Sequence, residues 1–188
     1  DMDGGGEAYY VYDGSGERVR KVHEHNGNLV EERIYLGNFE IYRKRSGRGL
    51  PLVLERQTLH IMDNKQRVAL IESRTRGDDP APQQLIRYQF GNHLGSAILE
   101  LDGQAQIISY EEYYPYGSTS YQAVRSQTEV ATKRYRYTSK ERDEESGLYY
   151  HGARYYAPWL GRWTSTDPIQ LSGGINMYRA FINNPLLF

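Results

Sequence analysis

Alternating apolar and polar residues, broken at short intervals by Gly- and Asp-containing turns, fill much of the chain. The first unit consists of Tyr9–Tyr12, the turn Asp13–Gly16 and the return run Arg18–Val22. Alternation predicts a strand with one packed face, and Asp-Gly followed by Gly supplies the positive φ angles that tight hairpin turns need. We therefore predict a β-hairpin at the start of the chain.

The same arrangement recurs further along the sequence. Predicted hairpin arms are residues 29–35 with 39–43, 59–62 with 67–72, and 86–90 with 96–101, followed by a strand at 106–113. Equivalent positions lie roughly 23 to 27 residues apart, a spacing at which internal repeats indicate stacked supersecondary units. The predicted fold class is all-β, built from antiparallel hairpin repeats.

Three stretches lack the pattern. Residues 45–52 and 75–84 contain Gly, Arg or Pro and are predicted to be loops, and 119–132 is polar and poor in strand signals. We divide the chain into hairpin repeats at 1–118, a polar loop at 119–134 and a separate region at 135–188.

Only one short helix is predicted. Residues 172–181, and 175–181 in particular, favour it because Gly173 and Gly174 lead in and Asn183-Asn184-Pro185 stops it. The residue before a proline disfavours the helical conformation, which supports this end point.

The aromatic residues change the picture of the core. Tyr accounts for 18 residues, against 4 Phe and 2 Trp, and the hydrophobic fraction is only 38%. Tyr offers a large apolar face and a hydroxyl that needs a partner. A thin, Tyr-lined β layer is therefore expected rather than a thick aliphatic core.

Charge and composition exclude several functions. Lys and Arg total 23 against 24 Asp and Glu, so the chain has no net field to attract nucleic acid or an anionic membrane. No Cys is present, which excludes a disulfide, a Cys-based zinc site and a thiol nucleophile. We predict no cofactor and no metal site, because His23 and His25 share a strand face but offer only two ligands.

The stretch from Tyr135 to Pro185 differs from everything before it. It contains a charged turn at 140–145, Tyr pairs at 149–150 and 155–156, the sequence Pro158-Trp159-Leu160-Gly161-Arg162-Trp163, and Asp167-Pro168. Tyr10-Val11-Tyr12-Asp13, with Gly16 and Arg18, resembles the Tyr-Asp repeat of RHS or YD-repeat proteins. The later stretch resembles the RHS-associated core, and 158–163 is most similar to the C-component of Tc toxin complexes and related SpvB-linked proteins.

The resemblance implies that the repeats form part of a curved, hollow shell around a C-terminal toxic effector, and that residues 135–188 form an irregular plug at one end. The implied partners are the rest of the same shell, the enclosed effector and a B-component or SpvB-like protein. It also implies secretion or delivery from a bacterium, with no signal peptide in this chain.

The family is further associated with aspartic autoproteolysis that releases the effector. Arg154 and Asp167 match the family's Arg and first Asp. The second Asp belongs to a closing Asp-Pro-x-Gly-Leu segment that we expect beyond Phe188, so this chain alone is expected to be inactive. Asp167 also has a simpler interpretation as a turn residue in Thr164–Pro168.

The other charged and aromatic residues suggest further roles, of which one is excluded and one stays open. Glu111 and Glu112 do not form a glycosidase pair, because neighbours on a strand point to opposite faces. The acidic residues at 141–145 are expected to form a solvated turn, with pairing to Arg154 or Arg162 as the alternative. We expect Trp159 and Trp163 to anchor the plug.

The Tyr pairs could stack on sugars or bases, but packing is favoured. The alternative function is accordingly a Tyr-rich β-repeat module that binds carbohydrate or a protein partner without cleaving anything.

Overall fold

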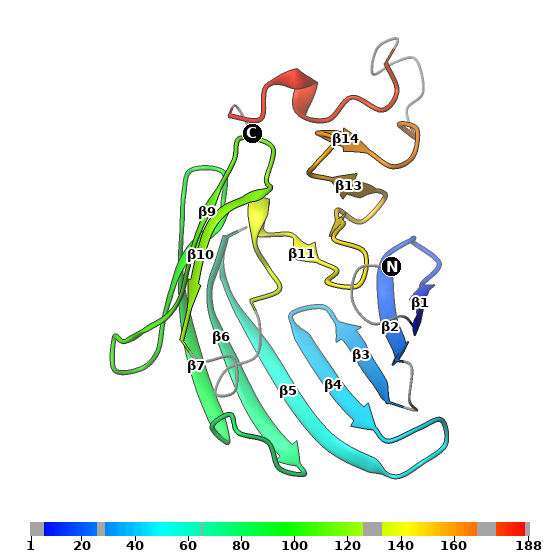
Figure 1. Cartoon of the computed structure of the whole chain (residues 1–188), viewed down its shortest axis with the longest axis vertical. Coiled ribbons are helices and arrows are strands. Elements are labelled where there is room, and N and C mark those ends of the chain that lie inside the picture. The colour runs from blue at the N-terminus through cyan, green and yellow to red at the C-terminus, as the bar shows by residue number, and fades with distance from the viewer. Residues whose placement is uncertain (1–5, 26–28, 65, 126–132, 169–175, 187–188) are drawn as a thin grey trace.

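The computed structural model describes residues 6–25, 29–64, 66–125, 133–168 and 176–186. Its main element is an antiparallel sheet of ten strands that lie in chain order, each hydrogen-bonded to its sequence neighbours (Figure 1). The strands are β1 Gly6–Tyr12, β2 Arg18–His25, β3 Val30–Leu36, β4 Phe39–Arg45, β5 Leu52–Asp63, β6 Gln66–Arg76, β7 Gln84–Gly91, β8 Ala97–Leu101, β9 Ile107–Tyr113 and β10 Thr119–Val124. The hairpins and the all-β class predicted from the sequence are confirmed.

One turn design is repeated in the sheet. Asp13 Oδ1 accepts hydrogen bonds from the amides two and four residues later, and Asn92 and Asp102 do the same. The fourth residue of each turn has a positive φ: 84° at Gly16, 76° at Gly95 and 58° at Ala105. The Asp of the Tyr-Asp motif therefore fixes a hairpin turn.

The sheet curves strongly and does not close on itself, with β1 and β10 at its two edges (Figure 1). Pairing registers shift at several points, including Glu55/Arg56 and Ile61/Met62 in the long strand β5. Such bulges bend and twist a strand. They help to give the sheet a concave face, across which the C-terminal region runs.

The C-terminal region forms a second, smaller sheet of four strands: β11 Glu141–Arg142, β12 Tyr149–Tyr150, β13 Tyr155–Ala157 and β14 Arg162–Trp163. Single turns of 3-10 helix flank it, η1 at Tyr137–Ser139 and η3 at Phe181–Asn183. The described part of residues 135–188, predicted to be irregular, thus consists of short strands and single 3-10 turns.

A cluster of aromatic residues forms the core between the two sheets. Tyr137, Tyr149, Tyr156, Ala180 and Phe181 are buried in it. The three Tyr hydroxyls donate to the carbonyl oxygens of Pro115, Gly117 and Tyr116, at 2.8, 3.2 and 2.8 Å respectively. One turn after β9 thus accepts all three hydroxyls, which is how a Tyr-rich core satisfies its polar atoms.

Two predicted elements are corrected. Residues 119–124, predicted as strand-poor, form β10, which pairs with β9. Most side chains of β10 are exposed, so the backbone ladder makes this strand without an apolar pattern that the sequence could display.

The helix expected at 172–181 is wrong for residues 176–180, and 172–175 lie outside the described residues. The Asn176 side-chain oxygen accepts a hydrogen bond from the Tyr178 amide at 3.2 Å, and the Asn176 backbone carbonyl oxygen accepts one from the Arg179 amide at 3.2 Å. Arg179 and Arg162 form an isolated antiparallel β-bridge through their backbones. Local hydrogen bonds from an Asn side chain to nearby backbone groups compete with helix formation in this way. No helix in the described ranges is long and apolar enough to cross a membrane.

Candidate functional site

Arg154 and Asp167, the two residues predicted to carry chemistry, lie together beside strands β13 and β14 of the small sheet. Arg154 directly precedes β13 and Asp167 follows β14, and one guanidinium nitrogen of Arg154 lies 3.1 Å from Asp167 Oδ2. The Asp167 amide donates to the Met177 carbonyl oxygen at 2.9 Å, which fixes the segment after β14. Both side chains remain partly accessible.

Aromatic rings position the arginine. The Arg154 guanidinium carbon lies 4.1 Å from the centroid of Trp163, a cation–π contact. Trp163 also packs edge-on against His151, with ring centroids 5.0 Å apart. Burial, with Lys140 and Arg154 nearby, lowers the pKa of His151 to about 3, so this ring is neutral at physiological pH. His151 was not singled out in the sequence, where it is an isolated histidine.

The small sheet is attached to the concave face of the large sheet by buried ion pairs. Glu111 of β9 contacts Lys133 at 3.0 Å and Arg136 at 3.3 Å, and all three side chains are almost fully buried. Burial opposes ionisation of Glu111, but Lys133 and Arg136 lower its pKa below the usual value. Lys133 also donates to the Ala97 carbonyl oxygen at 2.6 Å.

A second pair of contacts continues the attachment across the sheet. Glu40 of β4 is reached by Arg134 at 2.6 Å and by the hydroxyl of Tyr135. Arg18 of β2 contacts Glu141 and Asp143, each at 2.7 Å. We call residues 133–143 the docking arm, because their side chains bind charged groups on β9, β4 and β2. Figure 1 shows this part of the chain running across the concave side of the large sheet.

These contacts correct both interpretations for Glu141 and Asp143 of the acidic turn, whereas Glu144 is exposed as predicted. Glu141 and Asp143 are buried rather than solvated, and they pair with Arg18 instead of Arg154 or Arg162. The Arg of the Tyr-Asp repeat is therefore a docking residue. Sequence reasoning missed it because the partners are more than 120 residues apart.

The aromatic predictions are confirmed in part. One Tyr of each pair, Tyr149 or Tyr156, is buried in the core, whereas Tyr150 and Tyr155 contact Tyr12 and Tyr10 of β1. The predicted packing role of the two Tyr pairs is therefore confirmed. Trp163 packs against the core, but Trp159 is 56% exposed, so its predicted anchoring is wrong.

Glu111 and Glu112 lie on opposite faces as predicted, Glu111 buried and Glu112 exposed. A histidine cluster is larger than the sequence suggested, because Glu31 of β3 lies beside His23 and His25. The register that pairs β2 with β3 places Glu31 opposite His23, and this pairing is not visible in the sequence of either strand alone.

The chain is similar to known toxin proteins over nearly its whole length. It is 40% identical over 184 residues to the toxin subunit YenC2 of Yersinia entomophaga, a match that covers 94% of this chain and 18% of the relative. The crystal structure of TcdB2-TccC3 superposes with a TM-score of 0.88 at 38% identity, over 96% of this chain and 9% of that one. The chain thus resembles an RHS-associated segment of the Tc toxin C-component type.

This RHS segment also resembles the toxin protein Tse5 of Pseudomonas aeruginosa, with 27% identity over 96% of the segment and 15% of Tse5. The Photorhabdus luminescens Tc holotoxin pore contains a chain that superposes with a TM-score of 0.88 over the full segment and 9% of that chain. No family model matches the sequence. The segment spans less than a fifth of the length of these relatives.

Proposed function

We propose that this RHS segment is the closing end of a shell that encloses a toxic effector, and that the intact protein frees the effector by aspartic autoproteolysis. The observation that carries the cleavage proposal is the ion pair between Arg154 and Asp167 beside the small sheet. The open, curved ten-stranded sheet supports the shell proposal, because both of its edge strands offer backbone groups for further strands.

In the proposed reaction, two carboxyl groups act on one water molecule. Arg154 holds Asp167 in position. The carboxylate of Asp167 accepts a proton from the water molecule while the water oxygen attacks the carbonyl carbon of the scissile peptide. A second Asp, from the closing segment expected after Phe188, supplies the proton that the leaving nitrogen takes when the C–N bond breaks. One carboxylate cannot perform both roles, which is why the segment alone is expected to be inactive.

The test is mass spectrometry of the intact gene product. The wild-type protein should be recovered as two fragments cut shortly beyond the position of Phe188. Asp167→Asn and Arg154→Ala should leave it uncut. Asp78→Asn is the matched control, because the Asp78 side chain is 92% exposed and pairs only at the surface with Arg74. It should be cut like the wild type.

Each uncut variant must also be shown to be folded, by elution at the wild-type position and by an unchanged pattern of limited proteolysis. An intact wild-type protein, or folded Asp167→Asn protein that is cut at the wild-type rate, would refute the proposed protease.

We further propose that the partners are the rest of the shell, the enclosed effector and a B-component or SpvB-like protein, and that the protein is secreted or delivered from a bacterium. The solved structures that this chain resembles support this, because they are TcdB2-TccC3 and a Tc holotoxin pore.

A further inference from the structure

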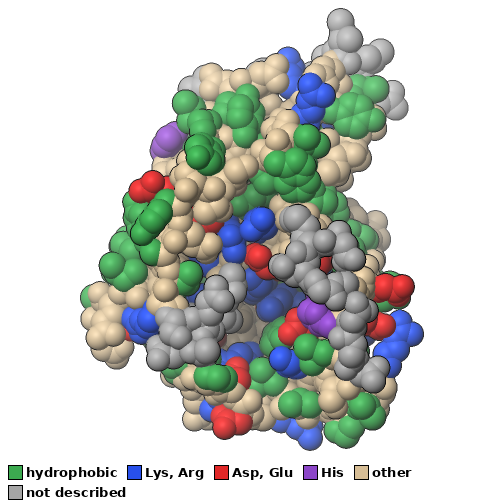
Figure 2. Space-filling view, viewed as in Figure 1, with side chains coloured by type: hydrophobic (Ala, Val, Ile, Leu, Met, Phe, Trp, Pro, Cys, Tyr) green, Lys and Arg blue, Asp and Glu red, His purple; other side chains and the backbone are tan. Residues whose placement is uncertain are grey.

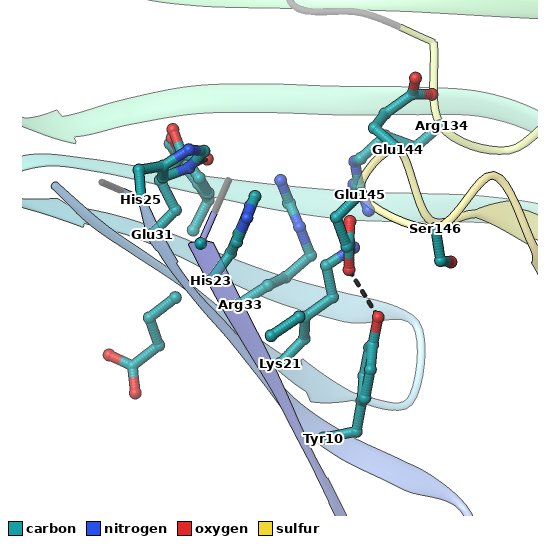
Figure 3. A pocket seen from close by; sticks show the side chains of 14 residues that line it. Tyr10, Lys21, His23, His25, Glu31, Arg33, Arg134, Glu144, Glu145 and Ser146 are labelled. Atoms are coloured by element: carbon teal, nitrogen blue, oxygen red, sulfur yellow. Dashed lines mark hydrogen bonds and ion pairs between the residues drawn. The ribbon is translucent and has the colours of Figure 1, made fainter. Parts of the chain in front are cut away.

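His23, His25 and Glu31 converge on one point of the concave face. His23 and His25 alternate along β2 and so point to the same side, and Glu31 lies directly opposite His23 in the register with β3. One nitrogen of each imidazole and one carboxylate oxygen lie within 4.8 Å of one another. Figure 3 shows the three side chains on the same face of neighbouring strands.

The distances suit a bound metal ion. His25 Nε2 lies 3.1 Å from Glu31 Oε2. Ligands placed about 2.0–2.1 Å from a tetrahedral zinc ion are separated by about 3.3 Å, so this pair needs almost no movement. The imidazole rings of His23 and His25 have centroids 3.9 Å apart. A small rotation of the His23 side chain would therefore bring its nitrogen into position as the third ligand.

Glu31 is also held in the orientation that binding requires. Tyr42 of β4 donates its hydroxyl to Glu31 Oε1 at 2.7 Å, which leaves Oε2 directed at the histidines. Tyr42 is in turn fixed by Arg33, whose guanidinium carbon lies 4.8 Å from the ring centroid. A hydrogen bond of this kind to a metal-binding carboxylate sets its direction and commonly affects affinity.

Space for a further ligand is present. The three residues line a cavity of about 700 Å³ between the large sheet and the turn at 144–146, part of the hollow where Lys and Arg side chains gather in Figure 2. The register partners of His23 and His25 on β1 are Ala8 and Gly6, which place little bulk beside the rings. A water molecule or a substrate group can therefore reach the open side.

Three of the cationic side chains that line the cavity are already paired with carboxylates. Lys21 is paired with Asp143 at 2.8 Å and Glu145 at 2.9 Å, and Arg134 is paired with Glu40 and Glu141. Arg33 lies 3.2 Å from Glu40. These cations are neutralised by carboxylates other than Glu31.

We propose that His23, His25 and Glu31 form a binding site for a divalent transition metal of the zinc class, with one coordination position open to the cavity. Two imidazoles and one carboxylate are the ligands of open zinc sites, whereas Mg²⁺ and Ca²⁺ prefer oxygen ligands throughout. The site joins β2 to β3 near the sheet edge and is separate from Arg154 and Asp167.

The test is binding of Zn²⁺ and of Co²⁺ to the intact gene product, by calorimetry and by the visible absorption of bound Co²⁺. The wild type should bind one equivalent more than His23→Gln, His25→Gln or Glu31→Gln. Tyr42→Phe should weaken this site about 10- to 100-fold, as expected for loss of a supporting hydrogen bond. His93→Gln, which removes an exposed histidine elsewhere, should bind like the wild type.

Thermal melts with and without zinc distinguish loss of the site from loss of folding. A ligand that binds only to the folded state raises the melting temperature. The increase should occur in the wild type and His93→Gln and be absent in His25→Gln. Equal stoichiometry in wild type and folded His23→Gln and His25→Gln variants, or weak binding that Tyr42→Phe leaves unchanged, would overturn the proposal.

Discussion

His151 packs among Tyr156, Trp163 and Phe181, and its buried Nε2 has no hydrogen-bond partner among the described residues. Such a ring is tolerated only in its neutral form, because a charged imidazolium would lose its hydration. The residue lies one turn from Arg154 and contacts the same Trp163. Its protonation state is therefore linked to the packing of the proposed catalytic pair.

The pH dependence follows from this burial. The pKa of His151 falls from 6.5 to about 3 on folding, so below pH 6.5 the unfolded state binds a proton that the folded state does not. Stability should fall as the pH decreases, by at most about 1.4 kcal/mol per pH unit. Between pH 6.5 and 5, above the range of ordinary carboxylates, His151→Phe should reduce the slope of melting temperature against pH, and His93→Gln should not. Equal slopes in all three proteins would contradict this account.

At the scale of elements, the repeated turn explains why the hairpins could be predicted. The side-chain oxygen at its first position and the positive φ at its fourth are both local properties, set by Asp or Asn and usually Gly. Ala105 is the exception among these turns, because it adopts a φ of 58° with a Cβ present.

Replacing Ala105 with Gly should therefore stabilise the β8–β9 hairpin. The left-handed conformation costs a residue with a Cβ roughly 1–2 kcal/mol, and part of that gain is offset by the greater entropy of Gly when unfolded. We expect a net gain of about 0.5–1 kcal/mol, seen as several-fold slower hydrogen exchange across this hairpin in the intact protein. Ala123→Gly, in the extended strand β10, should speed exchange locally instead. Faster exchange in Ala105→Gly would show that its φ is not a source of strain.

Elements that depend on distant partners could not be predicted in the same way. β10 has an exposed, polar sequence and becomes a strand only because β9 offers a free edge. The segment 176–180 lies within the range predicted to be helical, but backbone contacts with Trp163 and Arg162 of β14 hold it in a non-helical conformation. Arg154 and Asp167 were found through the family resemblance, whereas Glu31 and the partners of the docking arm follow from strand register and curvature, which no local pattern encodes.

At the scale of the whole molecule, the docking arm joins the two sheets through buried charges in addition to Tyr137 of the aromatic core. Glu111 with Lys133 and Arg136 is the most deeply buried of these attachments. Removing one partner of a buried ion pair leaves the others buried without compensation, which typically costs about 3–5 kcal/mol.

Glu111→Gln should therefore release the docking arm. Tryptic cleavage at Lys133, Arg134 and Arg136 in the intact protein should become faster by a factor on the order of a hundred to a few thousand, because cleavage follows the population of the open form. Glu112→Gln is the matched control on the exposed face of the same strand and should be cut like the wild type. If the two variants are cut at equal rates, the arm is held by other contacts.

The chain-order arrangement of the ten strands has a consequence for synthesis. Each strand leaving the ribosome finds its partner already made, because that partner is the strand before it, and short-range pairing of this kind forms early. The docking arm emerges only afterwards, and its partners Arg18, Glu40 and Glu111 come from three different hairpins. The docking arm can bind all three only when the curved sheet is complete. Its binding is therefore the last step of folding and requires that the ten strands are correctly paired.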